Sequence, residues 1–417
     1  MTRTLALIPA IAFASAITAL AQEATRPEPT HEKFTVAGEP KPVTFVADFV
    51  GRFLGGDRTG DNTPGFYPAV GRIVSGAGWI SIGPGYRQRV LRGRAVIDGS
   101  AAISLRAYKQ GHARFEFTDL ANSRVAVGTQ VQWQDLTQVH YFGNGPDSPV
   151  DGASEYRMKT TDVVGYGSYR PTRWLTIGAS GGRLDGPTLD AATGPLDSDY
   201  PDARLMYQAD PAFALERQPS FAYGTLSVTA DTRDYADHPS RGGLYRAAFT
   251  RYSDLDLRAF TFNQYEAEGA QFVPLLYDGV VLAFHGWTTL SDTADGQTVP
   301  VYLMPSLGGT SMLRAFPNYR FHDRNFLVVN AEARIALTMH IDTALFVDAG
   351  SVAPRVGDLR IANASYGLGL RLHTHKTTTV RLDAGHGREG WRVSFSLNDP
   401  FRLSRLTRKT AVVPFAP

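Results

Sequence analysis

The chain has 417 residues, with 42 lysines and arginines against 40 aspartates and glutamates, and it has no cysteine. A net charge of +2 gives no electrostatic basis for binding nucleic acid or another polyanion, and a chain without cysteine cannot form disulfides. The 41 glycines and 11% aromatic residues suit a sheet protein with many turns, whereas the mean hydropathy of −0.19 does not separate a soluble protein from a barrel with a polar lumen.

Residues 1–21 have the pattern of a secretory signal peptide. An apolar run over residues 4–20 follows Arg3 and ends at Ala19-Leu20-Ala21, a small-x-small cleavage pattern. The alternative is an uncleaved anchor helix, for which the run is short, because a helical span needs about 20 residues. Since no later stretch has an apolar run of that length, the sequence excludes a helical membrane protein.

Residues 22–67 are polar and contain scattered prolines and glycines. Within them, residues 43–54 place Phe45, Phe49 and Phe53 at a spacing that fits one face of a helix and also one face of a strand. A short interfacial helix, a first strand and a plug are therefore all open for this stretch. We expect a short periplasmic segment here, because too few residues precede the strands to form a folded periplasmic domain.

Residues 68–398 carry one strand pattern after another, and the clearest covers residues 124–142. Apolar or β-prone side chains alternate there with small and polar ones over a length well beyond an ordinary strand. The side chains predicted to share the apolar face are Val125, Val127, Thr129, Val131, Trp133, Val139 and Tyr141. Alternation of apolar with polar or small residues over about 9–11 residues is typical of strands that cross a membrane as a closed barrel.

Fifteen strands are predicted in all. They cover residues 78–91, 94–108, 112–120, 124–142, 155–169, 174–184, 221–230, 244–252, 257–272, 279–290, 326–337, 341–350, 363–372, 378–385 and 391–397. Bacterial single-chain barrels have even strand numbers, so we expect one more strand near the N-terminus. The predicted fold is an all-β transmembrane antiparallel β-barrel of sixteen strands in the outer membrane of a Gram-negative bacterium. A basic C-terminal tail, residues 399–417, follows it.

Two predicted connections are long, covering residues 186–220 and 291–325. The first reads as an exposed loop, although its acids leave recruitment of divalent cations open; these acids are Asp190, Asp197, Asp199, Asp202 and Asp210. Residues 231–242 read as a polar hairpin in which aspartate caps the turn and Gly242 supplies backbone freedom.

Signals for catalysis and for metal binding are weak. The chain has no G-x-S-x-G elbow and no P-loop. His373 and His375 share one face of a strand and His386 follows, but no carboxylate or cysteine lies nearby at ligand spacing. We therefore expect no enzymatic activity, no metal site and no cofactor.

Arg314 is the most informative charged residue. It lies between a Gly-Gly turn and a strand in which Glu332 and Arg334 fall on the same face as Asn330, and Asp348 lies in the next strand. An arginine on a loop folded back against lumen-facing carboxylates would form charge-assisted hydrogen bonds inside a partly dry pore. An exposed extracellular arginine is the alternative on spacing alone.

The same region resembles the bacterial surface-antigen barrel of the BamA/TamA outer-membrane assembly family. The motif residues are Leu307, Gly308, Gly309, Leu313, Arg314, Ala315, Phe316, Arg320, Phe321, Asp323, Glu332 and Asp348. Residues 141–145 and the 231–242 turn also resemble smaller members, so that the likeness runs from about residue 78 onward. It implies a sixteen-stranded barrel whose sixth extracellular loop folds into the lumen, with Arg314 contacting Glu332 and Asp348.

The resemblance implies assembly, insertion or translocation of proteins or envelope components, with outer-membrane lipid, client proteins and a separate periplasmic module as partners. Three departures from the family pattern stand out. Ala315 replaces the usual glycine after the arginine, the periplasmic repeats called POTRA domains are missing, and the 399–417 tail follows the last strand. A passive channel or structural surface barrel with an internal loop plug is the alternative function.

Overall fold

The computed structural model describes residues 35–37, 64–70, 73, 80–195, 200–276, 279–374, 378–397, 399–401, 403 and 406. The predicted signal peptide, the stretch over residues 43–54, His375 and most of the 399–417 tail lie outside these residues. Among the described residues, no helix has both the length and the apolar character needed to cross a bilayer.

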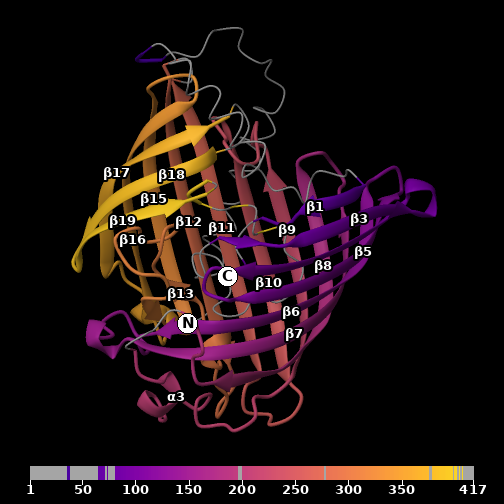
Figure 1. Ribbon diagram of the computed structural model, residues 1–417, viewed down its shortest axis with the longest axis vertical. Coiled ribbons are helices and arrows are strands. Elements are labelled where there is room, and N and C mark those ends of the chain that lie inside the picture. The colour runs from indigo at the N-terminus through magenta and orange to yellow at the C-terminus, as the bar shows by residue number, and fades with distance from the viewer. Residues whose placement is uncertain are drawn as a thin grey trace.

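One large antiparallel sheet of seventeen strands dominates the described chain (Figure 1). Its strands are β1 (Gly65–Pro68), β2 (Ser81–Ile82), β3 (Pro84–Val90), β4 (Ala95–Ser104), β5 (Lys109–Leu120), β6 (Val125–Tyr141), β7 (Ser154–Tyr169), β8 (Leu175–Asp190), β9 (Phe221–Asp231), β10 (Gly242–Asp254), β11 (Phe262–Leu275), β12 (Val280–Thr293), β15 (Asn325–Ala336), β16 (Ile341–Ala353), β17 (Asn363–His373), β18 (Thr378–Gly387) and β19 (Gly390–Ser396). A separate hairpin joins β13 (Ser306–Leu307) to β14 (Phe321–His322). Short helices are η1 (Leu91–Gly93), η2 (Val150–Gly152), α3 (Ala203–Met206), η3 (Val301–Leu303) and η4 (Val356–Asp358).

Every predicted strand has a counterpart, several differ in extent, and three of these differences stand out. The first divides into β2 and β3 around Gly83, where a Cβ would lie 1.8 Å from the Ala101 carbonyl oxygen, so the backbones approach too closely for a side chain. β8 runs on to Asp190, which shortens the first long connection. β11 begins at Phe262 and not at residue 257. The additional N-terminal strand corresponds to β1, which pairs with β3.

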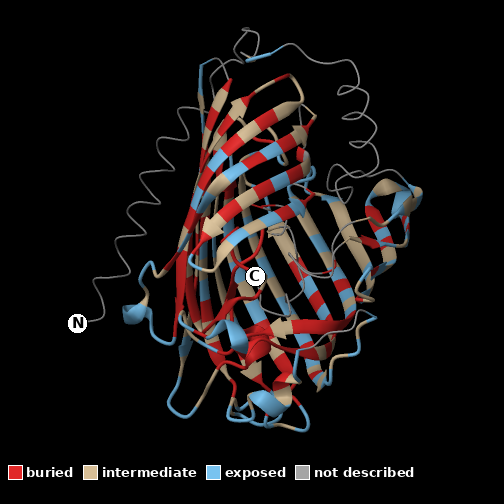
Figure 2. Ribbon diagram, turned by 60° about the vertical axis from the view of Figure 1, so that its left-hand side comes forward, coloured by how far each residue is buried: buried red, intermediate tan, exposed pale blue. Residues whose placement is uncertain are grey.

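Buried and exposed residues alternate along the strands, as the banding in Figure 2 shows. In β15, Asn330, Glu332 and Arg334 are buried, whereas Val329 is exposed, which confirms the predicted parity. On β19 the apolar side chains face outward, and Trp391 is 69% exposed. Polar side chains inside and apolar ones outside are the reverse of the usual soluble arrangement and match a surface in contact with lipid.

The prediction for the second half of β6 is wrong. Val127, Val131 and Trp133 are exposed as expected, but Val139 and Tyr141 are buried on the opposite face. The register between β6 and β7 shifts between Leu136 and Val139. Because a bulge adds one residue to one strand, it reverses the parity of every residue that follows.

The two ends of the sheet differ in their connections. Short turns, such as residues 170–174 and 337–340, lie at one end. At the other end, toward the bottom of Figure 1, lie the longer connections, including the one with α3 and residues 294–324 with the β13–β14 hairpin. The residue pairings lead without a break from β3 to β19 in chain order, and the described residues give no register between β19 and β1–β4.

Candidate functional site

The connection over residues 294–324 folds back onto β15 and β16 through a tight turn. Gly308 and Gly309 have φ values of 128° and 85°, which favour glycine. The Gly309 amide donates to the Phe316 carbonyl oxygen at 3.1 Å, and the Phe316 amide donates to that of Leu313 at 3.0 Å. Leu313 and Phe316 are fully buried against apolar side chains that include Trp287, so the turn presents the arginine between them to the sheet.

Arg314 contacts both carboxylates of the predicted set. Its Nη2 donates to Asp348 Oδ1 at 2.7 Å and its Nε to Asp348 Oδ2 at 3.0 Å, while its Nη1 donates to Glu332 Oε2 at 2.5 Å. The Arg314 backbone amide also donates to Asp348 Oδ2 at 3.1 Å. The guanidinium lies 3.5 Å from the centroid of the Phe346 ring. A planar fork of donors between two carboxylates fixes both position and orientation of the side chain.

Arg314 stays charged in this site. Burial lowers the pKa of Arg314, but the charges of Asp348 and Glu332 outweigh that effect and hold the pKa above its ordinary value. Asp348 accepts further hydrogen bonds from Asn330 Nδ2 and from Ser365 Oγ, each at 2.9 Å. The carboxylate is therefore fully paired within the protein, which a buried charge requires.

The carboxylates belong to a larger buried network that sequence reasoning missed. Glu332 accepts from Arg371 Nη2 at 3.0 Å and from Arg334 Nε at 3.1 Å. Arg371 Nη1 lies 2.7 Å from Asp383 Oδ1, and Arg334 Nη2 lies 3.0 Å from Asp399 Oδ2. The cations are Arg314, Arg334, Arg371 and Arg381, and the anions are Glu332, Asp348, Asp383 and Asp399. Four charges of each sign cancel.

Two hydrogen bonds to main-chain carbonyls attach the segment further. Arg381 Nη2 donates to the Thr310 carbonyl oxygen at 2.6 Å, and Asn330 Nδ2 donates to that of Met312 at 2.7 Å. Both donors project from the large sheet. Residues 310–314 are thus bonded to β15, β16 and β18 together.

Ala315, the departure from the family pattern, fits because glycines on β18 face it. A Cβ on Gly387 would lie 3.0 Å from the Ala315 Cβ, and one on Gly385 would lie 3.3 Å from the Ala315 amide nitrogen. Ala315 itself is not among the described residues with positive φ. The extra methyl group is accommodated where the opposing strand has no side chain.

Arg320 attaches the second half of the connection to two other parts of the sheet. Its Nε donates to Glu389 Oε1 at 2.8 Å, between β18 and β19. Its Nη2 donates to the Ser148 carbonyl oxygen at 2.7 Å, in the β6–β7 connection. Its guanidinium lies 4.6 Å from the centroid of the Phe321 ring. Asp323 accepts from the Arg324 amide at 2.8 Å, and burial raises the pKa of its carboxyl to about 6.

The other candidate residues have separate places. Asp202 accepts from the Arg204 amide at the start of α3, and Asp210 accepts from the Ala212 amide. Asp197 and Asp199 lie outside the described residues. His386 packs against Trp391. In the 231–242 turn, Asp234 accepts from the Ser240 amide, and Gly242 has a φ of 81°, in agreement with the predicted polar hairpin.

The family model of the Omp85 superfamily domain matches residues 194–397, which include Arg314, Glu332 and Asp348. This part of the chain, just under half of it, is therefore similar to the Omp85 superfamily domain. Omp85 barrels reside in the bacterial outer membrane and are generally non-enzymatic transport and assembly proteins. No curated protein sequence matches the chain.

Among the solved structures similar to the chain, BamA supports the fold. BamA from Haemophilus ducreyi lacking POTRA domains 1-3 aligns with a TM-score of 0.57 at 13% identity, over 80% of this chain and 67% of that chain. CdiB from Acinetobacter baumannii aligns with a TM-score of 0.47 at 15% identity, over 76% and 56% of the two chains. CdiB from Escherichia coli gives 0.45 at 13% identity, over 79% and 61%. The BamA likeness shows that the sheet has the fold of an Omp85 barrel.

Proposed function

We propose that this protein is an outer-membrane barrel that aids insertion or translocation of proteins or envelope components. The buried contact of Arg314 with Glu332 and Asp348, inside the Omp85 match, is the observation that carries the proposal. If β2 and β3 are counted as one, sixteen strands make residues 294–324 the sixth connection at the long-loop end. In the proposal this loop folds into the lumen, and Arg314 locks it there.

Localisation follows from the surface of the strands. Side chains such as Leu345, Tyr366 and Val393 are more than half exposed, although each is large and apolar. A row of such residues is stable only against lipid or a partner. In the proposal residues 1–21 direct export, residues 22–64 lie in the periplasm because β1 begins at Gly65, and short turns face the same side.

The proposed mechanism uses the ends of the sheet. β19 has 7 residues and β1 has 4, so both terminal strands are short, whereas β6 has 17. A short, imperfectly paired edge leaves backbone N–H and C=O groups to which a client strand can add. A separate periplasmic module recruits the client. The locked loop holds the lumen-facing side chains of β15–β18 in place while a client strand adds to the edge of the sheet.

Depletion of the protein, followed by quantitative profiling of the outer membrane, tests the assembly role. We expect a subset of outer-membrane proteins or envelope components to fall, and re-expression of the wild type to restore it. An Asp185→Ala variant is the matched control for expression, because its exposed pair with Arg183 lies away from the lock. An unchanged profile after depletion sinks the assembly role.

A passive channel or structural surface barrel is the second candidate, and the attachment of residues 294–324 favours it in one respect. Arg314 and Arg320 bond this connection to separate parts of the sheet, as a permanent plug requires. Conductance in planar bilayers separates the two functions. A steady open pore in the wild type supports a channel, and a closed barrel contradicts it.

A further inference from the structure

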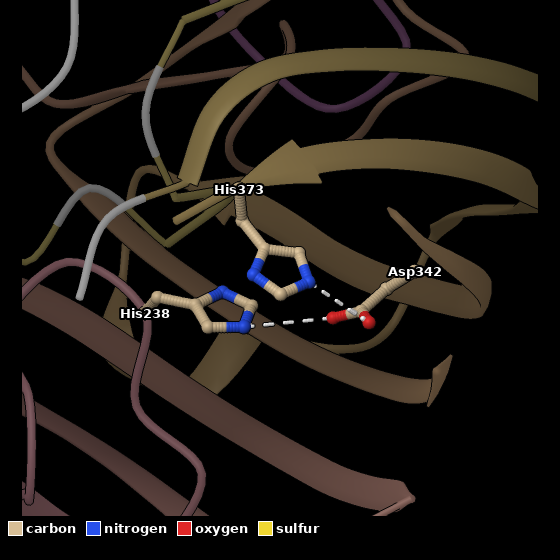
Figure 3. Close-up of side chains that lie close together, drawn as sticks. All are labelled: His238, Asp342 and His373. Atoms are coloured by element: carbon tan, nitrogen blue, oxygen red, sulfur yellow. Dashed lines mark ion pairs between the residues drawn. The ribbon is translucent and has the colours of Figure 1, made fainter. Parts of the chain in front are cut away.

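Three buried side chains meet at the short-turn end of the sheet, away from the Arg314 network. His238 comes from the β9–β10 turn, Asp342 from the start of β16 and His373 from the end of β17, and Figure 3 shows all three converging. Their exposed fractions are 8%, 3% and 1%. The sequence analysis found no carboxylate near His373 at ligand spacing. Asp342 comes instead from the neighbouring strand.

The β9–β10 turn contacts strands that are not its neighbours in the order of pairing. Four strands lie between β10 and β17 in the order of pairing, which are β11, β12, β15 and β16. Contacts of the turn with Thr378, at the start of β18, bridge that separation. The Thr378 amide donates to the Asp237 carbonyl oxygen at 3.2 Å, and His238 Nδ1 lies 3.0 Å from Thr378 Oγ1.

The distances suit a shared ion. His373 Nε2 lies 3.1 Å from Asp342 Oδ1, and His238 Nε2 lies 3.5 Å from Asp342 Oδ2. One ligand atom from each residue falls within 4.8 Å of the other two. Metal–ligand bonds of about 2.0–2.2 Å in a tetrahedral site place neighbouring ligand atoms roughly 3.3 Å apart. The two measured separations bracket that value.

The second nitrogen of each ring has its own partner, as metal-ligating histidines require. His373 Nδ1 lies 3.0 Å from the Thr374 carbonyl oxygen, which can only accept, so this nitrogen carries a proton. In the neutral ring the Nε2 atom then has a free lone pair directed at Asp342. Thr378 Oγ1 lies 3.0 Å from His238 Nδ1 and orients that ring, but a hydroxyl can donate or accept, so it leaves the His238 tautomer open. A second shell that fixes the tautomer is typical of metal sites.

We propose that His238, Asp342 and His373 bind one divalent transition-metal ion, with Zn²⁺ the best fit. Two imidazole nitrogens and one carboxylate oxygen are a common zinc donor set, whereas Mg²⁺ and Ca²⁺ prefer oxygen alone. Water takes the fourth position. The two rings stack at 4.0 Å with 15° between their planes. Binding therefore tilts the rings until both Nε2 lone pairs point at the ion.

The bound ion ties the β9–β10 turn to β16 and β17. Without it, His238 and His373 each approach Asp342 through their Nε2 atoms. These two states differ in ring geometry and in the affinity of the protein for metal. Metal binding here requires neither the Arg314 lock nor the assembly role, although Asp342 shares β16 with Asp348 and His373 lies two residues after Arg371.

The test uses the full-length protein without an affinity tag, folded in detergent and stripped with EDTA. We expect one Zn²⁺ per chain by competition titration, and one Co²⁺ with the visible absorption of a tetrahedral site. His238→Ala and His373→Ala lower Zn²⁺ affinity by at least about 100-fold, and Thr378→Val by about 10-fold. His386→Ala, a histidine outside the cluster, leaves affinity unchanged.

Two results overturn the proposal: a wild type that binds less than one ion per chain, or affinity that His238→Ala and His373→Ala both leave intact. Heat-modifiable migration in gel electrophoresis reports whether each variant is folded. If His373→Ala does not fold, His238→Gln decides, since its position lies in a turn. Metal affinity is measured on purified protein, so failure here leaves the assembly role untouched, and failure of the depletion test leaves the metal site untouched.

Discussion

The two halves of the inner face differ in how deeply their charges lie. On β15–β18 the side chains of Glu332 and Asp348 have no exposed surface. On the inner face of β5 the Arg114–Glu116 pair is 21% and 15% exposed, and on the outer face of β8 the Arg183–Asp185 pair is 59% and 58% exposed. This difference in exposure arises because residues 294–324, here called the covering segment, pack over β15–β18.

The exception within the N-terminal half supports the same explanation. Arg87 and Asp98 are 3% and 4% exposed and lie 2.6 Å apart. Tyr67 of β1 covers them, and its hydroxyl donates to Asp98 at 3.1 Å. In both places the buried charge lies under another part of the chain, residues 294–324 in one and the Tyr67 side chain in the other. Strand alternation alone directs a charged side chain inward, but it does not bury that side chain from water.

Removing Glu332 is expected to have the largest effect on this contrast. Glu332→Ala leaves Arg314, Arg334 and Arg371 buried without their shared anion. Loss of one partner from a buried network costs about 3–5 kcal/mol. The free energy of unfolding, measured by urea titration in detergent with tryptophan fluorescence, should fall by that amount. A loss below 1 kcal/mol would contradict the conclusion that the charges on the inner face of β15–β18 are buried from water.

Arg314→Ala should have the second-largest effect on stability. It removes the cation and frees the loop, while Glu332 retains its ion pairs with Arg334 and Arg371. We expect a loss of about 3 kcal/mol and new protease cleavage near Leu313 in intact cells. Arg183→Ala provides the control in the exposed half. Protease resistance equal to that of the wild type refutes the tucked loop.

Acid should act on the covering segment in two opposite ways. Burial lowers the pKa of His322 to about 3, so its contribution to stability is lost as pH falls below 6.5. Burial raises the pKa of Asp323 to about 6, so stability is gained as pH falls from 6 toward 3.8. In the wild type these effects cancel to within about 1 kcal/mol at pH 4.

Single variants separate the two groups. As the pH falls from 7 to 4, the free energy of unfolding of His322→Asn should rise by up to about 3 kcal/mol. That of Asp323→Asn should fall by about as much. Urea titrations at both pH values measure the difference. Equal pH dependence in the two variants would falsify this assignment.

Gly387→Val should push the covering segment away from β18. A Cβ there would lie 3.0 Å from the Ala315 Cβ and 3.1 Å from the Phe316 ring. Overpacking of this kind costs about 1–3 kcal/mol. The double variant with Ala315→Gly should recover part of the loss in the same urea titration. No recovery means that the strain lies elsewhere.

Asp185→Ala should have the smallest effect, below about 0.5 kcal/mol, because exposed ion pairs contribute little. Thermal unfolding followed by circular dichroism provides the check. A loss comparable to that of Glu332→Ala would remove the distinction between the two halves.

Much of the fold was predictable because alternation with a period of two is a local property of the sequence. The parity of Glu332 within β15 followed from its neighbours. The β6 bulge did not, since it depends on pairing with β7. The expectation that Arg314 meets Glu332 and Asp348 came from parity together with family resemblance.

Contacts across several strands were beyond sequence reasoning. Arg371 and Asp383 face inward by parity, but their meeting depends on the register between β17 and β18. The approach of His238 to His373 depends on contact between a turn and a strand that four others separate in the order of pairing. No local pattern records either of these relations.

Equal numbers of buried cations and anions around Arg314 have a consequence for how the segment detaches. When Arg314 leaves, three cations and four anions remain, so only a net charge of −1 draws the displaced guanidinium back. Attraction between two unit charges at 4 Å falls from about 4 kcal/mol at an effective dielectric constant of 20 to about 1 kcal/mol in water. Once water enters, the remaining attraction is therefore small. Release is cooperative, and partly detached states are sparsely populated.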